Sequence, residues 1–150
     1  MKRIYLASDH AGTLLKDQIC EQLAKTGYEV KDLGANGSES VDYPDFAASL
    51  AEAMLQDEGA KGILVCGSGI GISIAANRFS HIRAALVTDV TAARLSRQHN
   101  DANVLALGER LTGIATALDC VDAFLTTDFE GGRHQRRVDK LSSPQPASSE

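Results

Sequence analysis

The residues with the clearest potential for chemistry are Cys66 and the glycine-rich segment that follows it. An apolar run ends at Cys66, and glycines alternate from Gly67 to Gly71 before an expected helix over Ile72 to Arg78. Backbone N–H groups at a helix N-terminus favour negative charge, so they favour a thiolate and can hold an anionic oxygen. This combination suits the removal of a proton next to a carbonyl group.

Other interpretations of this segment are weaker. A cysteine at the end of a strand is more often a small buried hydrophobic residue, but the adjoining glycines favour a functional role for Cys66. The segment is not a dinucleotide-binding fingerprint, because Gly67, Gly69 and Gly71 alternate after the third expected strand rather than the first. Ile72 also occupies the place of the required third glycine, and the Walker lysine is absent.

A basic segment near the C-terminus, Gly131 to Arg137, is a second candidate site. Arginine offers planar, multidentate donors that suit phosphate, and Arg133 and Arg137 would lie on one helix face. From these residues alone, a phosphate clamp and a solvated basic turn are equally consistent with the sequence. His99 is a further candidate, although a lone histidine is more often structural. His81 is assigned a structural role.

Short strands and helices alternate along the chain and must position these residues. Apolar runs predict buried strands at Ile4 to Ser8, Tyr28 to Leu33, Gly62 to Cys66, Arg83 to Thr88 and Asn103 to Leu107. Between them, apolar residues recur at helical spacing, as at Leu15, Ile19 and Leu23. The alternation predicts an α/β fold, a three-layer αβα sandwich of Rossmann-like type with a five-stranded, mostly parallel sheet.

Ligands of such sheets bind at the carboxyl ends of the strands, so the residues that follow the strands are the candidates. Side chains that could take part in chemistry lie at the ends of four of the expected strands: Asp9, His10, Cys66, Asp89 and Arg110. Asp9 and Asp89 could instead cap the helices that follow them. The two interpretations are balanced for Asp9, and capping is favoured for Asp89.

Length and composition limit the function classes. A chain of 150 residues with 43% hydrophobic residues fits one domain, expected over 1–141, and the polar residues 142–150 predict a disordered tail. The net charge of -5 argues against a general nucleic-acid binder, so any anion site must be local. No apolar run approaches the ~18 residues of a membrane span, and Asp9 comes too early for a signal peptide, so we expect a cytoplasmic protein.

The cysteines are odd in number and widely spaced, at Cys20, Cys66 and Cys120. This spacing indicates neither a disulfide framework nor a zinc knuckle, so we expect free thiols. Cys20 and Cys120 fall within helical patterns and are assigned structural roles.

Five separated motifs together resemble type B ribose-5-phosphate isomerases. The motifs are Ser8-Asp9-His10-Ala11-Gly12, Asp42-Tyr43-Pro44, Cys66 to Asn77, Ser96 to Asn100 and Gly131 to Gln135. The wider family also contains galactose-6-phosphate and allose-6-phosphate isomerases. Ser68 stands where many members have threonine, which keeps a hydroxyl group. Cys66 is similar to the base of the cysteine branch rather than of the branch that uses a glutamate.

The resemblance implies interconversion of ribose 5-phosphate and ribulose 5-phosphate through an enediolate, without a metal or organic cofactor. It makes Cys66 the base and assigns His99 to opening of the sugar ring. The oxyanion would be held by the Ser68 hydroxyl and by the backbone amides of Gly67, Ser68, Gly69, Ile70 and Gly71.

The resemblance also implies substrate contacts and a partner. Asp9 and Tyr43 would orient the sugar, with Asp9 counted among the catalytic groups, and the phosphate would be bound by His10, Arg133 and Arg137. Members of the family are dimers, with a tetramer also open, and they have composite sites. Asn100 and Arg110 are therefore expected from a second subunit, with His99 as a further candidate. An isomerase of a six-carbon sugar phosphate and a noncatalytic sugar-phosphate sensor remain as alternatives.

Overall fold

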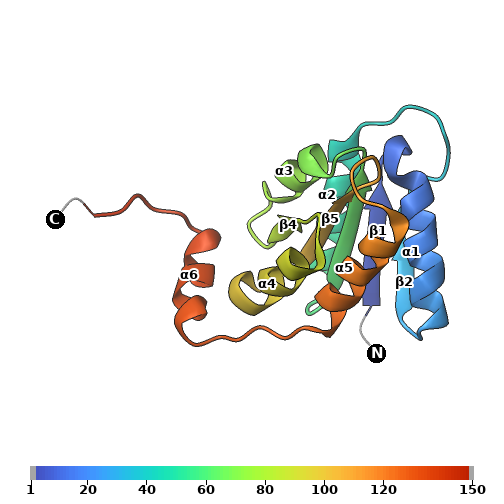
Figure 1. Ribbon diagram of the computed structural model, residues 1–150. Helices are drawn as coiled ribbons and strands as arrows, with labels where there is room; N and C mark the ends of the chain where they lie inside the picture. Colours follow the sequence, from blue (N-terminus) through green and yellow to red (C-terminus); the bar gives the residue numbers. More distant parts are fainter. Residues whose placement is uncertain (1–2, 149–150) are drawn as a thin grey trace.

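The computed structural model describes residues 3–148, which form a parallel sheet between two layers of helices (Figure 1). The strands of this part of the chain are β1 (Arg3–Ser8), β2 (Glu29–Asp32), β3 (Lys61–Cys66), β4 (Ala84–Leu86) and β5 (Val104–Gly108). Their order across the sheet is β2-β1-β3-β5-β4, and every neighbouring pair is parallel. The predicted α/β sandwich with a five-stranded sheet is confirmed.

Helices cover both faces of the sheet. They are a 3₁₀ turn η1 (His10–Gly12), α1 (Thr13–Lys25), α2 (Tyr43–Leu55), α3 (Ile70–Ala76), α4 (Val90–Asn100), α5 (Ile114–Thr126) and α6 (Arg133–Leu141). One core contains Leu15, Ala93 and Phe124 from α1, α4 and α5. The opposite core contains Leu50 and Ile72 from α2 and α3. Helix α6 lies outside this sandwich, beside α4 (Figure 1).

The central strands β1, β3 and β5 are buried almost throughout, as expected for parallel strands with helices on both faces. The edge strands β2 and β4 are largely exposed or half-buried. The expectation of buried strands over Tyr28 to Leu33 and Arg83 to Thr88 is therefore wrong in burial and too long. An edge strand has a neighbouring strand on one side only, so its apolar residues are not fully enclosed.

A buried charge fastens α1 to the end of β2. The Lys16 side chain is fully buried, and its Nζ donates to both carboxylate oxygens of Asp32 at 2.8 and 2.7 Å. Asp32 Oδ1 also accepts from the Gly34 N–H at 2.9 Å. Because a buried ammonium needs close acceptors, this contact fixes the start of the loop that leads to α2.

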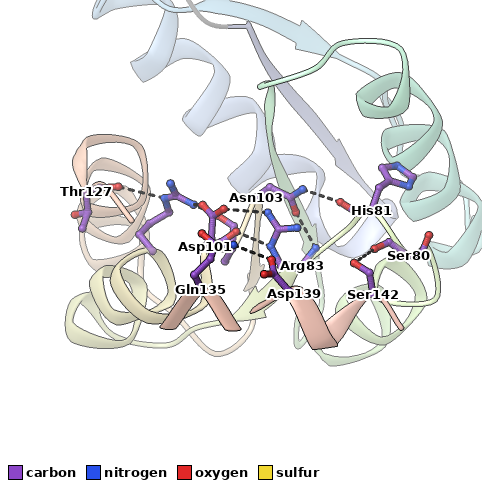
Figure 2. A network of polar contacts seen from close by, with 11 residues as sticks. Ser80, His81, Arg83, Asp101, Asn103, Thr127, Gln135, Asp139 and Ser142 are labelled. Carbon is purple, nitrogen blue, oxygen red and sulfur yellow. Dashed lines mark hydrogen bonds and ion pairs between the residues drawn. The ribbon is translucent and has the colours of Figure 1, made fainter. Parts of the chain in front are cut away.

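The C-terminal segment beyond α6 has no helix or strand over residues 142–148, and Ser142 Oγ donates to the Ser80 carbonyl oxygen at 2.8 Å (Figure 2). Disorder of residues 142–150 stays a prediction, and its last two residues, 149 and 150, lie outside the described residues. Among residues 3–148, no helix has the length and apolar character needed to cross a membrane.

Candidate active site

A cavity of about 550 Å³ opens at the carboxyl edge of the sheet. Its lining combines the ends of β1, β3 and β5 with the start of α2, and includes Asp9, His10, Tyr43, Cys66, Gly67, Ser68, Ile70, Gly71 and Arg110. The cavity lies where the chain order reverses, because β2 and β3 flank β1 on opposite sides. This switch point is the expected ligand site of an open α/β sheet. The structure therefore brings together most of the sequence-predicted candidates.

Cys66 is the last residue of β3 and is only 4% exposed. Its Sγ accepts a hydrogen bond from the Gly69 N–H at 3.1 Å. This contact places a backbone donor of the glycine loop directly on the sulfur. We predicted that the Gly69 amide holds the substrate oxyanion, whereas in the structure it donates to the Cys66 sulfur.

The glycine loop adopts a shape that side chains would prevent. Gly69 has a φ of 80°, and a Cβ atom there would lie 2.8 Å from the carbonyl carbon of Leu107. Gly71 lies under the Tyr43 ring, because a Cβ atom there would be 2.6 Å from Tyr43 Cζ. The loop thus admits a close approach of backbone and aromatic ring.

The helix after the loop begins at Ile70, two residues before the predicted start. The Ile70 N–H donates to Ser68 Oγ at 3.2 Å, so the hydroxyl oxygen covers one free amide of the first turn. Of the predicted oxyanion donors, the Gly69 and Ile70 amides are thus engaged within the loop.

Asp9 and His10 occupy the cavity and also organise the chain around it. Asp9 Oδ1 accepts from the Ala11 N–H at 3.0 Å, so the capping interpretation is correct, and Asp9 lines the cavity as well. His10 Nδ1 lies 3.1 Å from the Val41 nitrogen and 3.2 Å from its carbonyl oxygen. The His10 ring thereby holds the loop that leads to Tyr43.

Arg110 lines the same cavity as Cys66 of its own chain, whereas the resemblance implied that it comes from a second subunit. It follows β5, which neighbours β3, and its N–H donates to the Gly67 carbonyl oxygen at 2.9 Å. The guanidinium carbon lies 3.6 Å from where a Cβ of Gly67 would be. The adjacency of β5 and β3, which the sequence does not reveal, places Arg110 beside the glycine loop.

Glu109 has a supporting role that sequence reasoning missed. Its Oε1 accepts from the Leu15 N–H at 2.7 Å. A carboxylate at a helix N-terminus satisfies a free amide and complements the helix dipole. Glu109 therefore secures the start of α1, directly after the segment that carries Asp9 and His10. A glutamate 94 residues away in sequence gives no local capping signal.

The residues that were assigned structural roles have raised pKa values or contacts that suit such roles. Burial is the main cause that raises the pKa of Cys20 and of Cys120 to about 11 in each case. His81 Nε2 lies 2.7 Å from the Ala51 carbonyl oxygen. Asp89 Oδ1 accepts from the Ala92 N–H at 2.8 Å, which confirms the predicted helix cap.

A second cavity, of about 390 Å³, contains the remaining candidates. It lies between α4 and α6 and is lined by His99, Asn100, Arg133, His134, Arg137, Val138 and Leu141. Helix α4 runs from the carboxyl edge of the sheet back to its amino edge, where β5 begins. His99 and Asn100, at the end of α4, therefore lie at the opposite end of the sheet from Cys66. The two cavities share no lining residue.

A polar network fixes the end of α4 (Figure 2). Arg97 Nη1 donates to Asp101 Oδ1 at 2.9 Å, and Arg83 Nε donates to the Asp101 carbonyl oxygen at 2.8 Å. Asp101 has a φ of 46°, a left-handed conformation that ends the helix. His99 and Asn100 are thus presented from a rigid helix end.

The parallel sheet and the cavity at its switch point define an open α/β protein with a ligand site at the carboxyl edge of the sheet. The chain belongs to the Ribose/Galactose Isomerase family, whose sequence pattern matches residues 4–141. The resemblance seen in the sequence motifs is therefore confirmed.

Relatives of known structure or name agree with this assignment. Ribose-5-phosphate isomerase B of Escherichia coli K12 is 48% identical over 143 residues, which are 95% of this chain and 96% of that protein. The structure of ribose-5-phosphate isomerase B from Clostridium thermocellum has a TM-score of 0.91 and 54% identity, covering 93% of this chain and 95% of its own. The Mycoplasma genitalium enzyme with bound ribulose-5-phosphate has a TM-score of 0.90 and 44% identity, covering 93% of each chain.

Proposed function

We propose that this protein interconverts ribose 5-phosphate and ribulose 5-phosphate through an enediolate. The observation that carries the proposal is Cys66, whose sulfur accepts the Gly69 N–H inside a cavity that also contains Asp9, His10 and Arg110. The names of the E. coli and M. genitalium relatives support the choice of a five-carbon substrate.

The reaction moves a carbonyl group between carbons 1 and 2, so a base must remove the proton beside the carbonyl and return it to the other carbon. The Cys66 thiolate is the proposed base. Negative charge develops on the substrate oxygens, and donors already in place stabilise it. We assign this role to the Ser68 hydroxyl and to the backbone amides of Gly67, Ser68 and Gly71, because those of Gly69 and Ile70 are engaged within the loop. Those two amides reach the substrate only if they exchange partners.

The remaining groups of the cavity suit a polyhydroxylated, anionic ligand. Of the residues that line the cavity, we assign Asp9 and Tyr43 to orientation of the sugar hydroxyl groups, and His10 and Arg110 to donation toward an anionic group. Tyr43 lies over Gly71, beside the loop that would hold the oxyanion. We therefore assign the sugar to the space between Tyr43 and the glycine loop.

Ring opening and part of the phosphate binding require residues that a single chain keeps apart. His99, Asn100, Arg133 and Arg137 line the cavity at the opposite end of the sheet from Cys66. We propose that a second copy of the chain brings them to Cys66, so that a cytoplasmic homodimer contains two composite sites. Closed two-fold symmetry would complete both sites at once.

The test is a side-by-side assay of isomerisation with ribose 5-phosphate, allose 6-phosphate and galactose 6-phosphate. The proposal expects the highest kcat/KM with ribose 5-phosphate. A preference for a six-carbon substrate would move the protein to another branch of its family. Binding of all three sugars without turnover would indicate a sensor, and either result would overturn the proposed reaction.

A further inference from the structure

His99 does not stand alone in its cavity but is stacked on His134. The ring centroids are 4.4 Å apart and the ring planes differ by 14°. Glu130 Oε1 lies 3.5 Å from His134 Nε2 and 4.0 Å from His99 Nε2. The three residues come from α4, from the segment before α6 and from α6 itself.

We propose that His134 is a positioning residue that holds the His99 imidazole in place for ring opening, with Glu130 supporting the pair. This inference rests on the proposed isomerase function and on the assignment of His99 to the ring-opening step. His134 acts through His99, and no contact of His134 with substrate is required.

The burial of the two rings assigns their roles. The His134 side chain is 9% exposed and that of His99 is 39% exposed. His134 is therefore fixed in the fold and covers one face of His99, whose exposed remainder borders the cavity. A half-exposed side chain at a helix end would otherwise sample several rotamers. The stack restricts that freedom before substrate arrives.

The backbone around the stack is anchored to α4. The Glu130 N–H donates to the Gln98 carbonyl oxygen at 3.1 Å, one residue before His99. The His134 N–H donates to the Gly131 carbonyl oxygen at 3.0 Å, which closes the turn into α6. These bonds hold Glu130 and His134 beside the end of α4.

Charge explains the need for Glu130. Two adjacent imidazoles repel each other if both are protonated, and Arg133 and Arg137 add positive charge to the same cavity. The Glu130 carboxylate lies within 4.0 Å of both rings and offsets part of this charge.

The three side chains do not form a metal site in this geometry. Their donor atoms lie within 4.8 Å of one another, and two imidazoles with a carboxylate are suitable ligand types. A ring nitrogen directs its lone pair within the plane of its ring, however. Two planes that differ by only 14° at a centroid distance of 4.4 Å direct the lone pairs side by side, without a common point.

Ring opening requires a well-placed group at two oxygens of the sugar. The hydroxyl on carbon 1 loses its proton, and its electrons form the carbonyl double bond. The bond between carbon 1 and the ring oxygen breaks, and that oxygen takes up a proton. His99 exchanges these protons, and an imidazole displaced by about 1 Å can lose on the order of a hundredfold in rate.

The experiment compares His134→Ala, His134→Phe and the control Gln135→Ala. Gln135 lies next to His134 on α6, and its exposed side chain donates to the exposed Asp139 Oδ1 at 2.8 Å. We expect His134→Ala to lower kcat for ribose 5-phosphate about tenfold or more. His134→Phe keeps a ring on His99 and should recover most of this loss, and Gln135→Ala should behave like the original protein. Glu130→Gln, at an exposed position, should cause a smaller loss.

Two further readouts separate positioning from general damage. Deuterium uptake into carbon 1 of ribulose 5-phosphate needs no ring opening, so it should be unchanged in His134→Ala, as should the KM for ribose 5-phosphate. The His99 ring protons should lose their ring-current shift in the NMR spectrum of His134→Ala and keep it in His134→Phe.

Equal losses of exchange and isomerisation in His134→Ala would overturn the inference, as would no loss at all or no rescue by phenylalanine. Failure of the proposed function has a different signature. In that case the original protein would not isomerise ribose 5-phosphate, or His99→Asn would leave its isomerisation intact.

Discussion

The Gly69 N–H donates to Cys66 Sγ at 3.1 Å, so the loop that follows β3 folds back onto the residue that ends it. The left-handed φ of 80° at Gly69 makes this contact possible. Cys66 and this backbone donor therefore belong to one four-residue turn. The turn is also held from the end of β5, because the Arg110 N–H donates to the Gly67 carbonyl oxygen at 2.9 Å.

Cys66→Ala should lower turnover of ribose 5-phosphate by about a hundredfold or more, the usual contribution of a general base. Binding of a phosphorylated ligand should survive, because no phosphate contact is removed. Cys20→Ala is the matched control and should keep its activity. Steady-state kinetics and ligand titration of both folded variants test this, and a fully active Cys66→Ala protein would exclude Cys66 as the base.

Mixing two inactive variants tests the composite site. Cys66→Ala and His99→Asn subunits, exchanged in equal amounts, should form heterodimers with one intact site and one doubly altered site. Half of the dimers are heterodimers, so about a quarter of the original ribose 5-phosphate activity should return. Absence of recovery after proven subunit exchange would show that each chain completes its own site.

Arg137→Ala should weaken the binding of phosphorylated sugars by about 1.5 to 3 kcal/mol, the range for a hydrogen bond to a charged group. The expected result is a roughly tenfold to hundredfold rise in KM for ribose 5-phosphate, with little change in the low activity on free ribose. Arg136→Ala is the control, because Arg136 is exposed on the same helix and does not line the cavity. Equal fractional losses on both sugars would contradict a phosphate role.

Gly69→Ala should reduce both stability and turnover. A methyl group there would meet the Leu107 carbonyl carbon at 2.8 Å in a left-handed backbone, a strain of about 1 to 3 kcal/mol. Gly37→Ala should change stability by less than about 0.5 kcal/mol, because its nearest neighbour would be 4.0 Å away. Denaturant unfolding and kcat of the two variants provide the comparison.

Stability should fall as the pH rises from about 9 to about 11. Burial raises the pKa of Cys20 and Cys120 from 9.0 to about 11, so the unfolded chain releases these protons first. Their contribution is complete below pH 9 and is lost on passing pH 11. Denaturant unfolding across this range should show a shallower decline for a Cys20→Ala, Cys120→Ala double variant. At neutral pH, an alkylating reagent should modify Cys66 before Cys20 or Cys120, because the raised pKa of those two cysteines keeps them as unreactive thiols.

Sequence patterns predicted the layers of the fold and the edge of the sheet that carries Cys66. The layers follow from the periodicity of apolar residues, which is a local signal. The edge follows from the general rule that ligands bind at the carboxyl ends of parallel strands. The exposure of β2 and β4 escaped prediction, because the position of a strand in the sheet is set by pairing and not by its own residues. Apolar content alone does not distinguish an edge strand from a central one.

The site residues divide in the same way. Cys66, Asp9 and Tyr43 belong to local motifs, and the structure places them in one cavity. The place of Arg110 beside the glycine loop and the contact of Glu109 with α1 were not foreseen, because they cross between neighbouring strands and to α1. The His99 stack could not be foreseen, since it depends on how α6 returns to α4.

Because the two cavities lie apart in one chain, the proposed catalysis depends on the concentration of the protein. If Cys66 meets His99 only across two copies, activity per chain should fall on dilution below the dimer dissociation constant, although each chain stays folded. By mass action, a ligand that bridges both cavities must then tighten the association of the copies. Bound substrate would thus stabilise the dimer that converts it.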